Sequence, residues 1–205
     1  MNNEKQPFRQ QIAAVILAAG GSSRMGQPKL LLPWQGEALI RWPVKIALAA
    51  GLSPVIVVTG ASADEVEEAL NGLPVEIIHN PDWEKGQSTS LRCGIAALPE
   101  TSEAAILFLG DQPKLPGDLL EKMIAEFHAH APSIPIFIAS FHGKRGNPVL
   151  FDRSVFQDLQ RVEGDAGGRT IFNKYPVQYI PVESEDVLTD IDSPEDYQKF
   201  IESHQ

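Results

Sequence analysis

The chain has 205 residues, of which 43% are hydrophobic and 21% charged, as is typical of a globular protein long enough to bury a core. Its net charge of −10 argues against binding to nucleic acids or anionic membranes, because both attract basic surfaces. A single cysteine, Cys93, excludes an internal disulfide and predicts a cytoplasmic protein. No apolar run reaches the roughly 18 residues of a membrane span. We expect the polar residues 1–11 to be a flexible segment without a signal peptide.

Apolar segments alternate with amphipathic segments along most of the chain. In chain order, apolar runs predict strands at residues 12–18, 54–60, 75–80, 104–110 and 134–140. Helical spacing predicts intervening helices at residues 37–50, 62–70, 88–98 and 117–130. Strands that are apolar on both faces and alternate with helices indicate a mostly parallel sheet covered on both sides. We therefore expect an α/β fold, built as a three-layer α/β/α sandwich.

The alternation weakens in the last third of the chain but can still be followed. There we expect strands at residues 147–151 and 177–182 and a final helix at residues 193–203. Earlier in the chain, Ser62 is placed to cap the helix that follows it. No linker interrupts the pattern, so we expect a single domain over residues 12–205.

The loop after the first predicted strand is rich in glycine, serine and basic residues. Ligands of open α/β sheets bind beyond the carboxyl ends of strands, so this loop is the first candidate site. Glycines let backbone N–H groups approach a ligand, while hydroxyl groups and cations add donors and charge that suit a polyphosphate. The residues with these properties are Gly20, Gly21, Ser22, Ser23, Arg24, Gly26 and Lys29. An ordinary glycine-rich turn is the alternative, but two cations and two serines in one loop favour the phosphate site.

Two common phosphate-binding motifs do not fit this loop. A P-loop requires Lys and then Ser or Thr after its last glycine, whereas Gln27 and Pro28 follow Gly26. A dinucleotide fingerprint requires glycine where Ser22 stands. The segment LAAGGSSRMGQPK at residues 17–29 instead resembles the signature of MobA-like nucleotidyltransferases, which share a Rossmann-like α/β fold.

This resemblance implies roles for the loop. The backbone and Arg24 would hold a nucleoside triphosphate, and Lys29 would neutralise charge around its α-phosphate. The catalytic set that it implies is Arg24, Lys29 and Asp111, the last of which lies further along the chain. The further backbone contacts to the nucleotide that it implies are Leu17, Ala18 and Ala19.

Two acidic segments are candidates for binding a divalent cation. In LFLGDQP, Asp111 follows a predicted buried strand, although Gly-Asp at such a place is often a simple turn. The segment resembles a family metal motif, which implies Asp111 as a Mg²⁺ ligand with Gly110 beside the nucleotide. DIDSPEDY resembles the segment that supplies a second ligand, for which we favour Asp192 over Asp190. The alternative is that Asp192 or its neighbour only caps the last helix. Mg²⁺ takes few protein carboxylates and completes its shell with water and phosphate oxygens.

The start of the helix predicted at residues 88–98 is a further candidate, because the first N–H groups of a helix are free to receive a ligand. The segment beginning HNPDWEKGQSTS resembles one that lies against the nucleotide in related enzymes. This implies a supporting role for Gly86, Gln87 and Ser88, with a plain capped helix as the alternative. Trp83 could stack on a ligand or only pack against the protein.

Two segments of the second half resemble the molybdenum cofactor cytidylyltransferase branch of the family. They are RGNPVLF at residues 145–151 and GDAGGR at residues 164–169. In that branch they face the pterin phosphate, which implies acceptor contacts. The acceptor-binding residues implied are Arg145, Asn147, Asp165 and Arg169. A solvated loop is the alternative for each segment, and Arg169 could instead hold its own turn through Asp165.

The resemblance covers residue 12 to about residue 200, with the motifs in order. It implies transfer of CMP from CTP to the phosphate of molybdopterin, with Mg²⁺ as cofactor and a molybdenum hydroxylase as a candidate recipient of the product. A guanylyltransferase or a sugar-phosphate nucleotidyltransferase is an alternative, and Ala19 favours CTP because the guanylyl branch usually has glycine there. A non-catalytic carrier that serves a xanthine dehydrogenase-type enzyme is another, although a carrier has no need of Lys29, Asp111 and Asp192.

Overall fold

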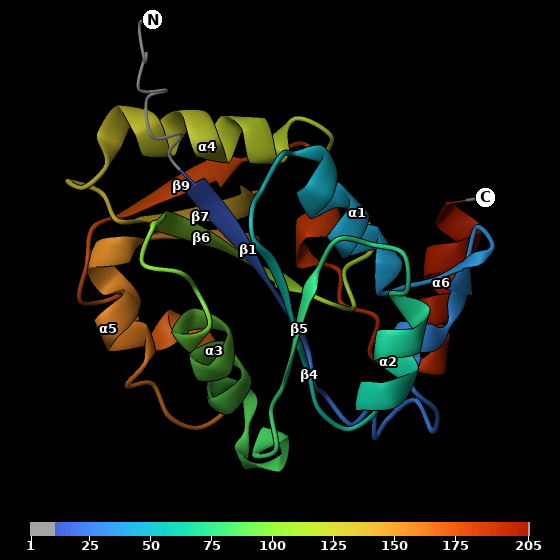
Figure 1. The fold of residues 1–205 in the computed structure, drawn as a ribbon. Coiled ribbons are helices and arrows are strands. Elements are labelled where there is room, and N and C mark those ends of the chain that lie inside the picture. The colour runs from blue at the N-terminus through green and yellow to red at the C-terminus, as the bar shows by residue number, and fades with distance from the viewer. Residues whose placement is uncertain (1–10, 205) are drawn as a thin grey trace, which may run out of the picture.

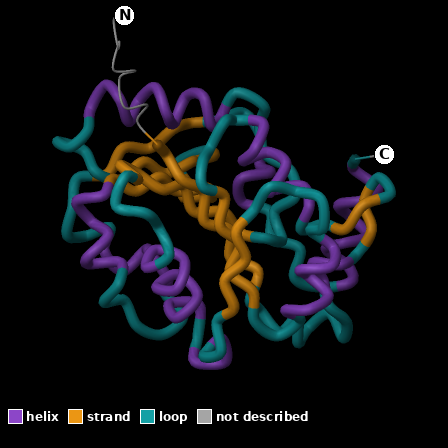
Figure 2. The backbone as a smooth tube through the Cα atoms, in the orientation of Figure 1, coloured by secondary structure: helices purple, strands orange, loops and turns teal. Residues whose placement is uncertain are grey.

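The structure, a computed structural model, describes residues 11–204. The segment that we predicted to be flexible, residues 1–11, lies outside this range except for Gln11, which begins the first strand. A seven-stranded sheet crosses the molecule between two groups of helices (Figure 1; Figure 2). From one edge to the other, its strands are β5 (Glu76–His79), β4 (Val55–Thr59), β1 (Gln11–Ala18), β6 (Ser102–Leu109), β8 (Lys144–Asp152), β7 (Ile136–Phe141) and β9 (Val177–Pro181).

Strand β8 runs antiparallel to both of its neighbours, β6 and β7. The pairs β1–β4, β1–β6, β4–β5 and β7–β9 are parallel. This mostly parallel sheet, covered by helices on both faces, confirms the predicted fold class. The strand at residues 147–151 proves longer than predicted, because β8 begins at Lys144, directly after a tight turn in which His142 and Gly143 both have positive φ angles.

Helices α1 (Arg41–Ala49), α2 (Ala63–Ala69) and α4 (Leu119–His130) cover one face of the sheet, and α3 (Gln87–Ala96) and α5 (Phe156–Leu159) cover the other (Figure 1). Alternate residues of a strand point to opposite faces, and β1 is apolar on both. Ile16 therefore packs in the cluster that contains Met123 of α4, while Val15 packs in the cluster that contains Leu91 of α3.

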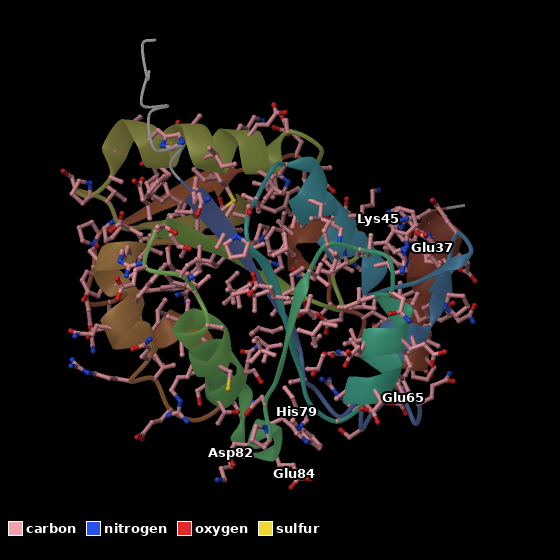
Figure 3. The ribbon with its side chains drawn as sticks, in the orientation of Figure 1. Glu37, Lys45, Glu65, His79, Asp82 and Glu84 are labelled. Carbon is pink, nitrogen blue, oxygen red and sulfur yellow. The ribbon has the colours of Figure 1, made fainter. Side chains whose placement is uncertain are left out.

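A small antiparallel hairpin replaces the start of the helix predicted at residues 37–50. Strands β2 (Pro33–Trp34) and β3 (Glu37–Ala38) pair around Gln35 and Gly36, which both have positive φ angles as the turn requires. The helix begins only at Arg41, and Lys45 in its second turn pairs with Glu37 (Figure 3). The prediction was wrong here because helical spacing of apolar residues continued through the turn.

Helix α6 (Pro194–Ser203) packs its Phe200 against Trp34 of the hairpin. Ser193 caps this helix in a reciprocal capping box with Asp196, and Pro194 occupies the first turn. Asp192 is therefore not needed as the cap. Ser62 occupies the N-cap position of α2 as predicted, but its side chain makes no capping hydrogen bond. Over residues 11–204, the structure has no helix that is long and apolar enough to span a bilayer.

Five short 3-10 helices escaped the sequence analysis, because runs of three to five residues carry too little periodicity to be detected. They are η1 (Lys29–Leu31), η2 (Trp83–Lys85), η3 (Arg153–Val155), η4 (Gly167–Ile171) and η5 (Glu185–Leu188). Of these, η1, η2 and η4 lie in the segments predicted to bind ligands.

Candidate active site

Segments from distant parts of the chain meet at one end of the sheet, the end where the parallel strands β1, β4, β5 and β6 finish. The parallel strands β1 and β6 end there, followed by the loop that contains Arg24 and by Asp111. Strand β8 is antiparallel to β6, with Leu107 opposite Val149, so its first residues lie beside the end of β6. The same end receives the start of α3, because that helix follows β5, another parallel strand.

A cluster of opposite charges lies at the centre of this end of the sheet. The Lys29 ammonium donates to Asp111 and to Asp192, the latter over 2.7 Å. Asp192 accepts a second hydrogen bond from Arg24, also over 2.7 Å. The Lys29 and Asp111 side chains are only 13% and 15% exposed. The structure thus brings together all three residues that we predicted to be catalytic, together with the favoured second metal ligand.

The backbone places a third carboxylate, that of Asp190, beside this cluster. The N–H group of Ile191 donates to the backbone oxygen of Asp111 over 3.4 Å, so the two aspartates that flank Ile191 lie next to Asp111. One is Asp192, described above. The other is Asp190, which accepts a hydrogen bond from Gln112 over 2.7 Å.

Lys29, Asp190 and Asp192 differ in how their surroundings shift their pKa values. Burial favours the neutral form of Lys29, but the adjacent Asp111 and Asp192 outweigh it and raise the pKa of the ammonium. Burial also opposes the charge of Asp192, yet hydrogen bonds from Lys29 and Arg24 lower its pKa. Burial, followed by repulsion from Asp111 and Asp192, raises the pKa of Asp190 to about 6. Lys29 and Asp192 are therefore fully charged at neutral pH.

The donor set fits a hard divalent cation. Asp111 and Asp192 both contact one ammonium group, so their carboxylates converge closely enough to share a cation. Within residues 11–204 there is no group of three or more His, Cys, Asp and Glu side chains arranged to hold a metal ion. A pair of carboxylates suits Mg²⁺ or a similar ion, which completes its coordination with water and substrate phosphate.

A cavity of about 570 Å³ opens beside the charged cluster. The predicted site residues that line it are Leu17, Ala18, Ala19, Gly20, Gly21, Arg24, Lys29, Gly86, Gln87, Asp111, Asp165, Arg169 and Asp192. Six further residues complete its wall: Leu30, Trp83, Glu84, Ser90, Leu109 and Asp190. The roles of Trp83 and Asp190 were left open by the sequence, and the other four were not among the predicted site residues. Trp83 also packs against the loop after β1, since a Cβ atom on Gly21 would lie 3.0 Å from its ring.

Five of the residues predicted to contact the nucleotide do not line this cavity: Ser22, Ser23, Gly26, Ser88 and Gly110. The Ser22 hydroxyl accepts the backbone N–H of Lys29 over 3.1 Å and so shapes the loop. Ser88 is buried, and its N–H donates to Gly164 over 3.1 Å. Ser90, half a turn further along α3, has its side chain on the cavity wall instead.

A second cavity, of about 850 Å³, adjoins the first. Cationic and aromatic side chains line it, among them Lys144, Arg145, Arg169, Phe151, Phe172 and Tyr179. Asn147 lines it too, and the Arg145 guanidinium lies 5.8 Å from the centre of the Phe172 ring. The two cavities share Gln87, Leu109, Arg169 and Asp190, which therefore mark their junction.

Two of the predicted acceptor contacts are placed differently from the others. Asp165 lines the first cavity rather than the second. Arg169 lines both, and its guanidinium donates to the backbone oxygen of Ala166 over 2.9 Å and of Asp165 over 3.5 Å. Arg169 therefore holds its own turn through backbone oxygens and not through the Asp165 carboxylate.

Comparison with known proteins assigns the family. The MobA-like NTP transferase domain matches residues 14–179. The chain is 33% identical to the molybdenum cofactor cytidylyltransferase of Escherichia coli (strain K12), over 91% of this chain and 93% of that protein. It is 30% identical to nicotine blue oxidoreductase of Paenarthrobacter nicotinovorans, over 93% and 96% respectively. A structure of Rv0371c from Mycobacterium tuberculosis H37Rv in complex with manganese superposes with a TM-score of 0.77 and 30% identity, over 94% of this chain and 99% of that one. The chain belongs to the MobA-like NTP transferase family and is a nucleotidyltransferase.

Proposed function

We propose that this nucleotidyltransferase transfers CMP from CTP to the terminal phosphate of molybdopterin and releases pyrophosphate. The observation that carries the proposal is the pair of adjoining cavities with the charged cluster of Lys29, Asp111 and Asp192 in the first. Joining two phosphate compounds requires two neighbouring sites and positive charge where they meet. The likeness to the Escherichia coli cytidylyltransferase supports CTP and molybdopterin as the pair.

In this mechanism the first cavity holds CTP. Arg24 and the N–H groups of the loop after β1 bind the β- and γ-phosphates, and Lys29 neutralises the α-phosphate. A molybdopterin phosphate oxygen attacks the α-phosphorus in line, a new P–O bond forms, and the bond to pyrophosphate breaks. Asp111 and Asp192 would hold Mg²⁺, which would supply further neutralisation of the charge that develops. Positioning and charge stabilisation by these residues account for the rate.

The second cavity suits the acceptor. Lys144, Arg145 and Arg169 provide positive charge for its phosphate on a protein with a net charge of −10. Phe172 and Tyr179 offer aromatic surface to a planar pterin, and Tyr179 is 49% exposed. A molybdenum hydroxylase in the cytoplasm that receives the dinucleotide cofactor is the partner that this function implies.

We expect CTP to be used in preference to GTP, ATP and UTP by roughly ten- to a hundredfold in kcat/KM. The reason is Ala19 in the wall of the first cavity and the RGNP segment in the wall of the second, both of which resemble the cytidylyl branch. The measurement is pyrophosphate release with each nucleotide, Mg²⁺ and molybdopterin, with a reaction lacking molybdopterin as the control. Equal or faster turnover with GTP would exclude the cytidylyl branch. No release with any nucleotide would exclude molybdopterin as the acceptor.

We expect Arg145→Ala to raise the KM for molybdopterin about ten- to a hundredfold and to leave the KM for CTP nearly unchanged. A charge-assisted contact to phosphate contributes about 1.5–3 kcal/mol, and Arg145 lines only the second cavity. Arg161→Ala is the matched control, because Arg161 is an exposed arginine that lines neither cavity. A comparable rise in the KM for CTP would contradict this division of the site. Arg169→Ala should affect both substrates, since Arg169 lines both cavities.

A further inference from the structure

Strand β5 is the outermost strand on one side of the sheet, and its outer edge is open (Figure 1). The N–H group of Asn80, directly after the strand, donates to the backbone oxygen of Thr59 over 2.9 Å. Because the backbone groups of a strand point alternately to its two sides, Ile77 and His79 direct theirs away from β4. No group within residues 11–204 accepts the N–H hydrogens of these two residues. The edge therefore offers unused donors and acceptors to a further strand.

The side chains of β5 suit an added strand on both faces of the sheet. Ile77 packs on the face that α1, α2 and α4 cover, and Ile78 packs on the face that α3 and α5 cover. Both are only partly buried, so each keeps apolar surface for a neighbouring side chain. Exposed edge strands usually carry lysine, proline or a bulge that prevents pairing, and β5 has none of these.

An apolar cavity of about 440 Å³ lies at the start of β5, at the end of the sheet opposite to the active site. The apolar side chains of Leu48, Leu52, Leu73 and Val75 line it. Residues that lie opposite each other on neighbouring strands share a face of the sheet. The residue of an added strand opposite Val75 would therefore direct its side chain toward this cavity, which suits a large apolar group.

The segment around β5 is strongly acidic. Residues 60–84 include seven acidic residues and no lysine or arginine. The acidic residues are Asp64, Glu65, Glu67, Glu68, Glu76, Asp82 and Glu84. In the part of the chain that the structure describes, only Asp82 among them is in an ion pair, with Lys85. Glu76 is exposed and lies in β5 itself, so a basic side chain opposite it in an added strand would be attracted.

A second copy of this chain does not meet these requirements. In an antiparallel pair, residues that point outward on one strand lie opposite residues that point outward on the other. Glu76 of one copy would therefore face Glu76, Ile78 or Asn80 of the other, depending on the register, and never a cation. Each copy also has a net charge of −10, which opposes the approach of two identical edges.

We propose that the open edge of β5 binds an extended, basic segment of another protein as an additional antiparallel strand. A large apolar side chain of that segment enters the cavity beside Val75, and a lysine or arginine lies opposite Glu76. Backbone pairing gives affinity, and these two side chains give specificity. Residues 75–79 line neither cavity of the active site, so the bound segment leaves nucleotidyl transfer unobstructed whatever the acceptor.

Fluorescence anisotropy with a synthetic peptide tests the proposal. The probe is fluorescein-labelled KTVTKLK, in which TVTKL lies opposite residues 79, 78, 77, 76 and 75 in that order. We expect the wild-type protein to bind it, with an affinity that falls as salt concentration rises. His79→Pro removes an outward N–H group and should weaken binding about three- to tenfold. His79→Ala loses the same side chain but keeps the N–H, so it should bind as the wild type does.

The outer side of an edge strand tolerates proline, and circular dichroism establishes that His79→Pro is folded. Methylation of the peptide backbone gives the same test without changing the protein. The central threonine of the probe, opposite Ile77, points its N–H at β5, so N-methylation there should weaken binding about tenfold. N-methylation of the preceding valine is the matched control, because that N–H points away from β5 and its loss should leave binding unchanged.

An exchange of charge tests the role of Glu76. Glu76→Lys should weaken binding of KTVTKLK about three- to tenfold and strengthen binding of KTVTELK, in which glutamate replaces the lysine opposite residue 76. A purely structural role of Glu76 would not reverse the preference between the two peptides.

Three results would contradict the inference and leave the proposed function standing. The first is a wild-type protein that does not bind KTVTKLK. The second is equal binding of the probe with and without methylation at its central threonine, which would mean that it does not pair as a strand. The third is a wild-type dimer in analytical ultracentrifugation that His79→Pro dissociates, because a second copy would then occupy the edge.

Discussion

Asp111→Asn should lower the rate of nucleotidyl transfer about a hundred- to a thousandfold and leave the protein folded. The substitution keeps the shape of the side chain but removes the negative charge that faces Lys29 and that we expect to bind a divalent cation together with Asp192. Asp111 follows β6 at the end of the sheet and belongs to neither large apolar cluster, so the core remains intact. The measurement is single-turnover pyrophosphate release over a range of Mg²⁺ concentrations, with circular dichroism as the test of folding.

Asp64→Asn is the matched control for this variant, because Asp64 is an exposed aspartate on α2 that lines neither cavity. Its rate should equal that of the wild type. If Asp111→Asn kept a wild-type rate with the same dependence on metal, Asp111 would have no part in catalysis.

Lys29→Met should reduce the rate to a similar extent, by about a hundred- to a thousandfold, because it removes the cation expected at the α-phosphate. The pKa of Lys29 is raised by Asp111 and Asp192 against the effect of burial, so the lost group is a full positive charge at neutral pH. Lys29→Arg keeps the charge but changes its shape, and we expect an intermediate rate. The measurement is the same single-turnover assay.

Lys29→Met also tests the metal site, independently of catalysis. In the protein without nucleotide, the Lys29 ammonium contacts both carboxylates that fit a divalent cation. Removing this competing charge should tighten Mn²⁺ binding to the free protein, which a titration followed by electron paramagnetic resonance can measure. Lys122→Met is the control, since Lys122 is an exposed lysine of α4 that pairs with Asp118. Weaker Mn²⁺ binding in Lys29→Met would mean that Asp111 and Asp192 do not form the metal site.

Local patterns in the sequence predicted most of the fold. Each of the central strands is continuously apolar because both of its faces are buried, and this property depends on a few neighbouring residues. The loop after β1 could likewise be identified as a candidate ligand site, since its glycines, serines and cations lie within ten residues of one another. Ser193, Pro194 and Asp196 form the cap of α6 within four residues, so this helix start was predictable too.

The local sequence pattern gave a wrong prediction where the same pattern fits both a helix and a strand. Residues 37–40 have the apolar spacing of a helix, yet the Gln35–Gly36 turn folds Glu37 and Ala38 back onto Pro33 and Trp34 as a hairpin. The hairpin is stabilised by packing of Trp34 against Phe200, a residue at the other end of the chain. No window of sequence around residue 37 contains that contact.

By itself, the sequence determined the α/β class, the glycine-rich loop after β1 and the family, because each depends on short local patterns that can be recognised one after another along the chain. Only the tertiary structure decided which side chains share the site. Asp192 meets Lys29 because the chain after η5 runs beside Asp111, and Arg145 adjoins the cavity because β8 is antiparallel to β6. Ser90 rather than Ser88 lines the first cavity because the rotation of α3 against the sheet directs it there. These contacts depend on strand order and helix rotation, which follow from packing of the whole chain and leave no local signal.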